Sequence, residues 1–80
     1  MENRSSIKLR NSSRRPLTIV IEPWAGQWEL APGSECEVFS VGGDARPRID
    51  LEWLDESCVV FYIETAGAIY EYWENGVLID

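Results

Sequence analysis

Residues 48–63, RIDLEWLDESCVVFYI, contain the pattern that decides the fold. Ile49, Leu51 and Trp53 alternate with charged side chains, which is typical of a β-strand with one face in a core. After a short turn, the run 58–63 is apolar at every position. Such a run indicates a central strand that is covered on both faces. We therefore expect a sheet packed against a second layer, with Trp53 in the core.

The rest of the chain repeats this arrangement of short apolar runs and turn residues, and no segment has a helical period. Because seven or eight short strands at regular spacing are typical of such folds, we predict a small all-β protein: an antiparallel β-sandwich or a partly closed barrel. The prediction is one domain over residues 1–80, with residues 1–5 disordered. The further expected strands are 7–10, 17–21, 27–30, 35–41 and 68–74, followed by a last strand after residue 76.

The dipeptide Asn75-Gly76 is the strongest local signal in the sequence. Both central positions of a type I′ turn require positive φ, which Asn and Gly tolerate best. The dipeptide therefore predicts a hairpin in which Glu74 pairs with Val77 and Trp73 lies opposite Leu78.

Charge is unevenly distributed along the chain, whose net charge is −7. Residues 1–16 have a net charge of +4 and residues 17–80 a net charge of −11. Because nucleic acids and anionic membranes are bound through Lys and Arg, we expect neither as a partner. No apolar run approaches the ~20 residues of a membrane span, and no signal peptide is visible, so we expect a cytoplasmic protein.

Two cysteines, Cys36 and Cys58, lie in expected strands. In a reducing compartment each would be a free thiol that packs as a small apolar side chain. A disulfide between them is the alternative, because two strands could bring them together.

Catalytic and metal-binding patterns are missing from the sequence, which contains no histidine. Its absence removes His-dependent triads, Cys–His dyads and His-ligated metal sites. The turn acids Asp44, Asp55, Glu56 and Glu64 do not have the spacing of a calcium loop. We therefore expect a protein that is not an enzyme, with no catalytic residue, no metal and no cofactor.

The stretch 22–33, EPWAGQWELAPG, contains the residues that we select as a candidate binding site. Tryptophan side chains on a sheet can stack on sugar rings or anchor a protein partner. The candidates are Trp24 and Trp28, with Glu22 from the same stretch and Trp73 beside the predicted hairpin turn. The alternative is structural: Trp24 covers one end of the sandwich, and Trp28 points inward from a short strand.

Several short motifs resemble those of known proteins. The order Asn11-Ser12-Ser13, then Glu22-Pro23-Trp24, then Leu30-Ala31-Pro32-Gly33, then Asn75-Gly76 resembles that of short uncharacterised bacterial proteins. That resemblance implies a small all-β sandwich and no assigned activity. Residues 7–38 also resemble, more distantly, the β-domain of the von Hippel–Lindau tumour suppressor, which implies a sandwich topology and an interaction role. Its histidine-containing ligand pocket does not carry over to a chain without histidine.

Three functions follow from these features. The first is a protein-interaction module with an unknown protein partner, which could also form a homodimer by pairing of exposed edge strands. The second is a carbohydrate-like ligand-binding module that uses tryptophan platforms. The third is an acidic decoy that imitates nucleic acid and occupies a DNA-binding protein; the −11 charge of residues 17–80 motivates it, and the basic N-terminal segment argues against it.

Overall fold

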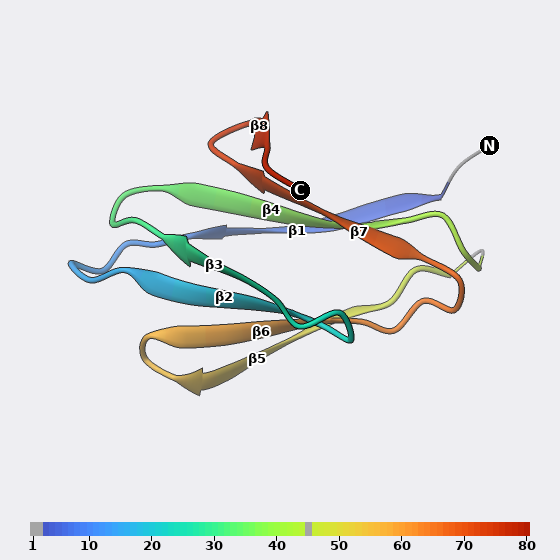
Figure 1. Ribbon diagram of the computed structural model, residues 1–80, viewed down its shortest axis with the longest axis horizontal. Coiled ribbons are helices and arrows are strands. Elements are labelled where there is room, and N and C mark those ends of the chain that lie inside the picture. The colour runs from blue at the N-terminus through green and yellow to red at the C-terminus, as the bar shows by residue number, and fades with distance from the viewer. Residues whose placement is uncertain (1–2, 45) are drawn as a thin grey trace.

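A computed structural model describes residues 3–44 and 46–80 of the chain. In these residues eight strands form two four-stranded sheets, which pack as two layers of a small β-sandwich and do not close into a barrel (Figure 1). The strands are β1 (Arg4–Arg10), β2 (Leu17–Glu22), β3 (Gly26–Leu30), β4 (Glu35–Val41), β5 (Ile49–Asp55), β6 (Cys58–Ile63), β7 (Ile69–Glu74) and β8 (Val77–Leu78).

The first sheet has the strand order β1-β4-β7-β8, and the second has the order β3-β2-β6-β5. All neighbouring strands are antiparallel except β2 and β6, which are parallel. The expectation of a purely antiparallel sandwich is therefore wrong at this one pair. Each strand runs opposite to the strand before it in the chain (Figure 1). After β3 the chain crosses to the first sheet to form β4, and it crosses back to the second sheet to form β5 and β6. Strands β2 and β6 are separated by an even number of reversals, so they lie side by side with the same direction.

The hairpin prediction is confirmed residue by residue. Glu74 pairs with Val77 and Trp73 with Leu78. Asn75 has φ 49° and Gly76 has φ 80°, as a type I′ turn requires.

The core lies between the two sheets. Strand β6 is internal in its sheet, as its apolar sequence predicts. Tyr72 and Phe61 are the largest of the side chains with almost no exposure to solvent. Around them pack buried aliphatic side chains and one cysteine from four strands, β2, β3, β4 and β6: Leu17, Ile19, Ile21, Leu30, Cys36, Val38, Val59 and Ile63.

The expectation that Trp53 is a core residue is wrong. Its register partner is Val59, which is fully buried, so Trp53 lies on the inner side of its sheet. However, β5 is an edge strand with a register shift between Trp53 and Asp55, and the indole is 50% exposed. Alternation along a strand predicts which side a residue faces, but it does not predict whether the opposite sheet reaches that far.

The remaining expectations concern the N-terminus and the cysteines. Arg4 and Ser5 belong to β1, so the expected disorder of residues 1–5 does not apply to them, and residues 1–2 lie outside the described part of the chain. Cys36 is buried, Cys58 is half-buried, and the two are free thiols in different sheets. Within the described residues no helix has the length and apolar character needed to cross a membrane.

Candidate functional site

Two of the predicted binding residues, Trp24 and Trp28, come together around β7. The Trp28 indole stacks on the Tyr72 ring with 4.4 Å between centroids and 16° between planes, and it meets the Tyr70 ring edge-on at 5.8 Å. The Trp24 indole also lies beside the Tyr70 ring, with 4.9 Å between centroids and 54° between planes. Four aromatic rings from the β2–β3 segment and from β7 thus close one lateral side of the sandwich.

The local sequence explains how this cluster forms. Pro23 follows β2 directly through a cis peptide bond, and Ala25 adopts a positive φ of 59°. The chain reverses here, since β2 and β3 pair antiparallel. A Cβ atom on Gly26 would lie 2.7 Å from the Trp28 ring and 2.9 Å from the Tyr70 hydroxyl. Only glycine leaves room for the indole to fold back over the turn, which is why glycine follows the first tryptophan so closely.

The C-terminal residues extend this cluster to the sheet edge. The Tyr70 hydroxyl donates a hydrogen bond to Asp80 Oδ2 at 2.7 Å, and the backbone of Tyr72 bonds to residues 79 and 80. Beside these contacts Val77, Leu78 and Ile79 are 48–60% exposed. We name this surface the aromatic edge; it consists of Trp24, Trp28, Tyr70, Val77, Leu78 and Ile79.

The two tyrosines beside Trp28, Tyr70 and Tyr72, have pKa values raised further above neutral pH. Burial, together with the hydrogen bond to Asp80, raises the pKa of Tyr70 to about 12. Burial is also the main reason why the pKa of Tyr72 is raised, with smaller effects of Cys36 and Glu74. Both phenols are therefore neutral at physiological pH, so the site offers aromatic surface without an acid or base near neutrality.

Trp73, the third predicted tryptophan, lies on the outer face of the first sheet. Its Nε1 donates to Glu71 Oε1 at 3.0 Å, and its ring lies 6.1 Å from that of Phe39. Arg4 makes two hydrogen bonds to the Glu71 carboxylate, at 2.7 and 3.2 Å, and stands 4.6 Å above the Phe39 ring. These donors lower the pKa of Glu71. Trp73 is held in this cluster and does not join Trp24 and Trp28, although its register partner Leu78 belongs to the aromatic edge.

Glu22, the fourth predicted residue, is separated from the tryptophans. It pairs in register with Tyr62, and its Oε1 atom is buried without a hydrogen-bond partner among the described residues. The face that it shares also contains Asp50, Glu52 and Tyr62. The sequence stretch alone could not separate Glu22 from Trp24, because side chains two residues apart across a turn need not share a face.

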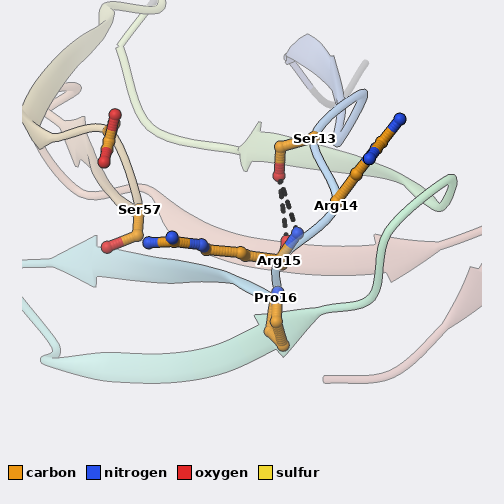
Figure 2. A pocket seen from close by; sticks show the side chains of 6 residues that line it. Ser13, Arg14, Arg15, Pro16 and Ser57 are labelled. Carbon is orange, nitrogen blue, oxygen red and sulfur yellow. Dashed lines mark hydrogen bonds between the residues drawn. The ribbon is translucent and has the colours of Figure 1, made fainter.

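A hollow lies where the loop before β2 meets the β5–β6 turn, and no sequence motif indicated it. It has a volume of about 320 Å³ and is lined by Ser13, Arg14, Arg15, Pro16, Glu56 and Ser57. In Figure 2 the Arg15 side chain extends toward Ser57, whereas that of Arg14 points away. Buried Asn11 orders the loop: its side chain donates to the carbonyls of Arg15 and Leu30 and accepts two bonds from Ser13. Glu56 on the rim offsets the positive charge of this hollow.

The acidic surface on the second sheet is interrupted by a cation. Arg48 lies 3.3 Å from Glu64 and 3.9 Å from Asp50. The neighbouring Asp50 raises the pKa of Glu64. Among residues 3–44 and 46–80, no three metal-ligating side chains gather in a way that could hold an ion.

Comparison of this chain with family models, with curated proteins and with solved structures finds no match in any of the three. What the aromatic edge can do chemically is to bury apolar and aromatic surface and to form backbone hydrogen bonds at an exposed sheet edge.

Proposed function

We propose that the protein is a non-enzymatic protein-interaction module that binds an extended segment of a partner protein at the aromatic edge. The observation that carries the proposal is the distribution of exposed apolar side chains. Among the described residues seven large apolar side chains are exposed, and four of them belong to the aromatic edge: Trp24, Val77, Leu78 and Ile79. Grouped exposed apolar residues are typical of interaction surfaces, and aromatic residues are enriched in them.

The backbone at this edge supports binding by strand addition. The N–H of Ile79 donates to the carbonyl of Tyr72, so Ile79 faces β7. Because neighbouring residues of a strand point their backbone groups in opposite directions, the N–H and C=O of Leu78 point away from the sheet. An extended partner segment could bond to them and place apolar side chains against Trp24 and Ile79.

The charges beside the edge define the partner further. Glu74 pairs with Val77, and Asp80 accepts the hydrogen bond of Tyr70, so two carboxylates flank the apolar surface. We expect a partner segment with apolar residues flanked by Lys or Arg, since charge complementarity favours association.

The carbohydrate alternative is less well supported by the positions of the indoles. Stacking on a sugar requires an accessible ring face. Trp28 is covered by Tyr72, and Trp73 is bound to Glu71 on another face of the molecule. The decoy alternative requires a continuous acidic surface, which Arg48 interrupts between Asp50 and Glu64.

The test is affinity capture from a lysate of the source organism with wild-type protein and three folded variants. Trp24→Ala and Leu78→Asp alter the aromatic edge, and Leu54→Asp is the matched control for Leu78→Asp because Leu54 is an exposed leucine on β5, outside the aromatic edge. The proposal expects a protein that wild type and Leu54→Asp both retain and that the two edge variants lose. A retained protein that all four bind equally, or no retained protein, would contradict it.

A further inference from the structure

The opposite lateral side of the sandwich is formed by two edge strands, β1 of the first sheet and β5 of the second. These strands approach each other across the space between the layers. Their inner side chains remain partly open to solvent: Ile7, Leu9, Ile49 and Leu51 are half-buried, and Trp53 is 50% exposed. This side is distinct from the aromatic edge and has no place in the function proposed above.

The two edges have opposite charge. Strand β1 contains Arg4, Lys8 and Arg10 and no acid, and β5 contains Asp50, Glu52 and Asp55 and no base. Lys8 pairs in register with Glu37, whereas Leu9 pairs with buried Cys36, so Lys8 and Arg10 lie on the outer face of the first sheet. Likewise Asp50 and Glu52 lie on the outer face of the second.

The backbone directions at the two edges follow from the printed hydrogen bonds. The N–H of Asn11 donates to Ser34, and the carbonyl of Asn3 accepts from Gly42, so odd-numbered residues near β1 face β4. The backbone groups of Ser6, Lys8 and Arg10 therefore point outward.

In β5 the odd-numbered residues, not the even-numbered ones, have outward-facing backbone groups. The carbonyl of Arg48 accepts from the N–H of Glu64, so the even-numbered residues face β6. The backbone groups of Ile49, Leu51 and Trp53 point outward.

We propose that two copies of the chain associate through this side, with β1 of each copy forming a parallel ladder with β5 of the other. In a parallel ladder, a residue whose backbone groups point toward the neighbouring strand bonds to two residues of that strand. These are the residues before and after the one that lies opposite to it. Ser6, Lys8 and Arg10, whose backbone groups point outward, would thus bond to the outward-facing odd-numbered residues of β5 and lie opposite its even-numbered residues. Their side chains would then stand beside those of Asp50 and Glu52 on one outer face.

The strand directions allow this arrangement with two-fold symmetry. Strands β1 and β5 run in the same direction (Figure 1). A two-fold axis parallel to the strands places the first sheet of each copy beside the second sheet of the other copy. The outer face of each sheet then stays on the outside of the dimer. The same contact covers Leu9 and Trp53 from both copies.

Charge disfavours the other symmetric arrangement. A two-fold axis perpendicular to the sheets would pair β1 with β1 and β5 with β5, antiparallel. Basic side chains would then meet basic ones and acidic side chains acidic ones, which is destabilising for directly opposed residues. Charge thus selects β5 of the other copy as the partner of β1, and the outward-facing backbone groups of the two strands allow that pairing.

The first experiment measures the dimer dissociation constant by sedimentation velocity at low salt for wild type, Ser6→Pro and Ser6→Ala. Proline at position 6 removes an outward N–H and leaves the bonds to β4 intact. Alanine is the matched control, because it removes only the hydroxyl that donates to Glu37. We expect a wild-type dimer that Ser6→Pro weakens at least about tenfold and that Ser6→Ala leaves unchanged. A monomeric wild type, or a dimer that a folded Ser6→Pro does not weaken, overturns the proposal.

Charge exchange provides a second test that does not depend on the proline variant. Asp50→Lys/Glu52→Lys should dissociate the dimer, and adding Lys8→Glu/Arg10→Glu to the same chain should restore it. Homotypic β1–β1 pairing predicts neither effect. A dimer unaffected by the β5 change, or one that the folded exchanged chain fails to restore, would contradict the proposal, whatever the outcome of the capture experiment on the aromatic edge.

Discussion

The Trp28 indole lies on the Tyr72 ring with 4.4 Å between centroids, although the two residues belong to different sheets. This contact joins the layers at the lateral side where β3 and β7 end the core. Trp24, four residues earlier, contacts the same aromatic cluster from outside and is 41% exposed. The two indoles of one short stretch therefore have different tasks: Trp28 stabilises the fold, and Trp24 is available to a partner.

This division predicts unequal effects of truncation on stability. Trp28→Ala should lower the free energy of unfolding by about 3–5 kcal/mol, as for large aromatic side chains removed from a core. Trp24→Ala should lower it by about 1 kcal/mol or less, because an exposed ring loses little burial. Urea denaturation followed by circular dichroism measures both values. Equal costs for the two variants would contradict the assignment of separate tasks.

Asn11 should be the most sensitive polar residue of the first loop. It is 3% exposed and donates to the buried carbonyl of Leu30. Because Asn11→Ala removes the side-chain bonds to the carbonyls of Arg15 and Leu30 at a buried position, we expect a loss of about 1–3 kcal/mol in unfolding free energy. Ser12→Ala, at an exposed neighbouring position, is the control and should change little. If both substitutions have the same effect, the loop is not ordered by the Asn11 side chain.

Glu71 should make the stability depend on pH. Hydrogen bonds from Arg4 and then Trp73 lower its pKa from the usual 4.5. A carboxylate with a lowered folded pKa stabilises the fold above its unfolded pKa, and the contribution disappears as the pH falls through the folded value. Wild type should thus exceed Glu71→Gln by up to about 1 kcal/mol at pH 7, with the difference vanishing well below pH 4.5. Urea midpoints of both proteins across this range test the prediction; a difference that persists in acid would argue against it.

The two cysteines should differ in reactivity. Burial, with a smaller effect of Glu74, raises the pKa of the Cys36 thiol to about 12, whereas Cys58 is half-buried near the start of β6. Because the thiolate is the reactive species, a thiol reagent should label Cys58 in the folded protein at least roughly tenfold faster than Cys36. Mass spectrometry of peptides after timed labelling distinguishes them. If neither Cys36 nor Cys58 were labelled before reduction and both were labelled after it, the two would form a disulfide, which would contradict the prediction.

The sequence allowed the strands and the last hairpin to be predicted because their signals are local. Alternation and turn residues lie within a few positions of the structures that they determine, as at Asn75-Gly76. The partners of each strand could not be predicted, since pairing of β1 with β4 or β2 with β6 depends on contacts between distant segments. The error at Trp53 has the same origin: the side that a residue faces is local, but its cover comes from another sheet.

The candidate site was predicted in part for similar reasons. Trp24 and Trp28 lie together because a turn with Gly26 connects them, and this proximity is visible in the sequence. Tyr70 and the exposed residues after the hairpin were not selected, because the sequence does not show that β7 lies against the turn after β2. The ion pair of Arg4 with Glu71 likewise joins residues 67 positions apart.

The central claim is that the aromatic edge binds a partner by strand addition beside Leu78. The most direct measurement is amide hydrogen exchange of the folded protein, by NMR, with and without the protein retained by capture. The account predicts that binding slows exchange at the outward-facing Leu78 amide and shifts the Trp24 indole resonance, while residues of β2 and β6 are unchanged. Binding that leaves Leu78 and Trp24 unaffected, with new protection elsewhere on the sandwich, would contradict it.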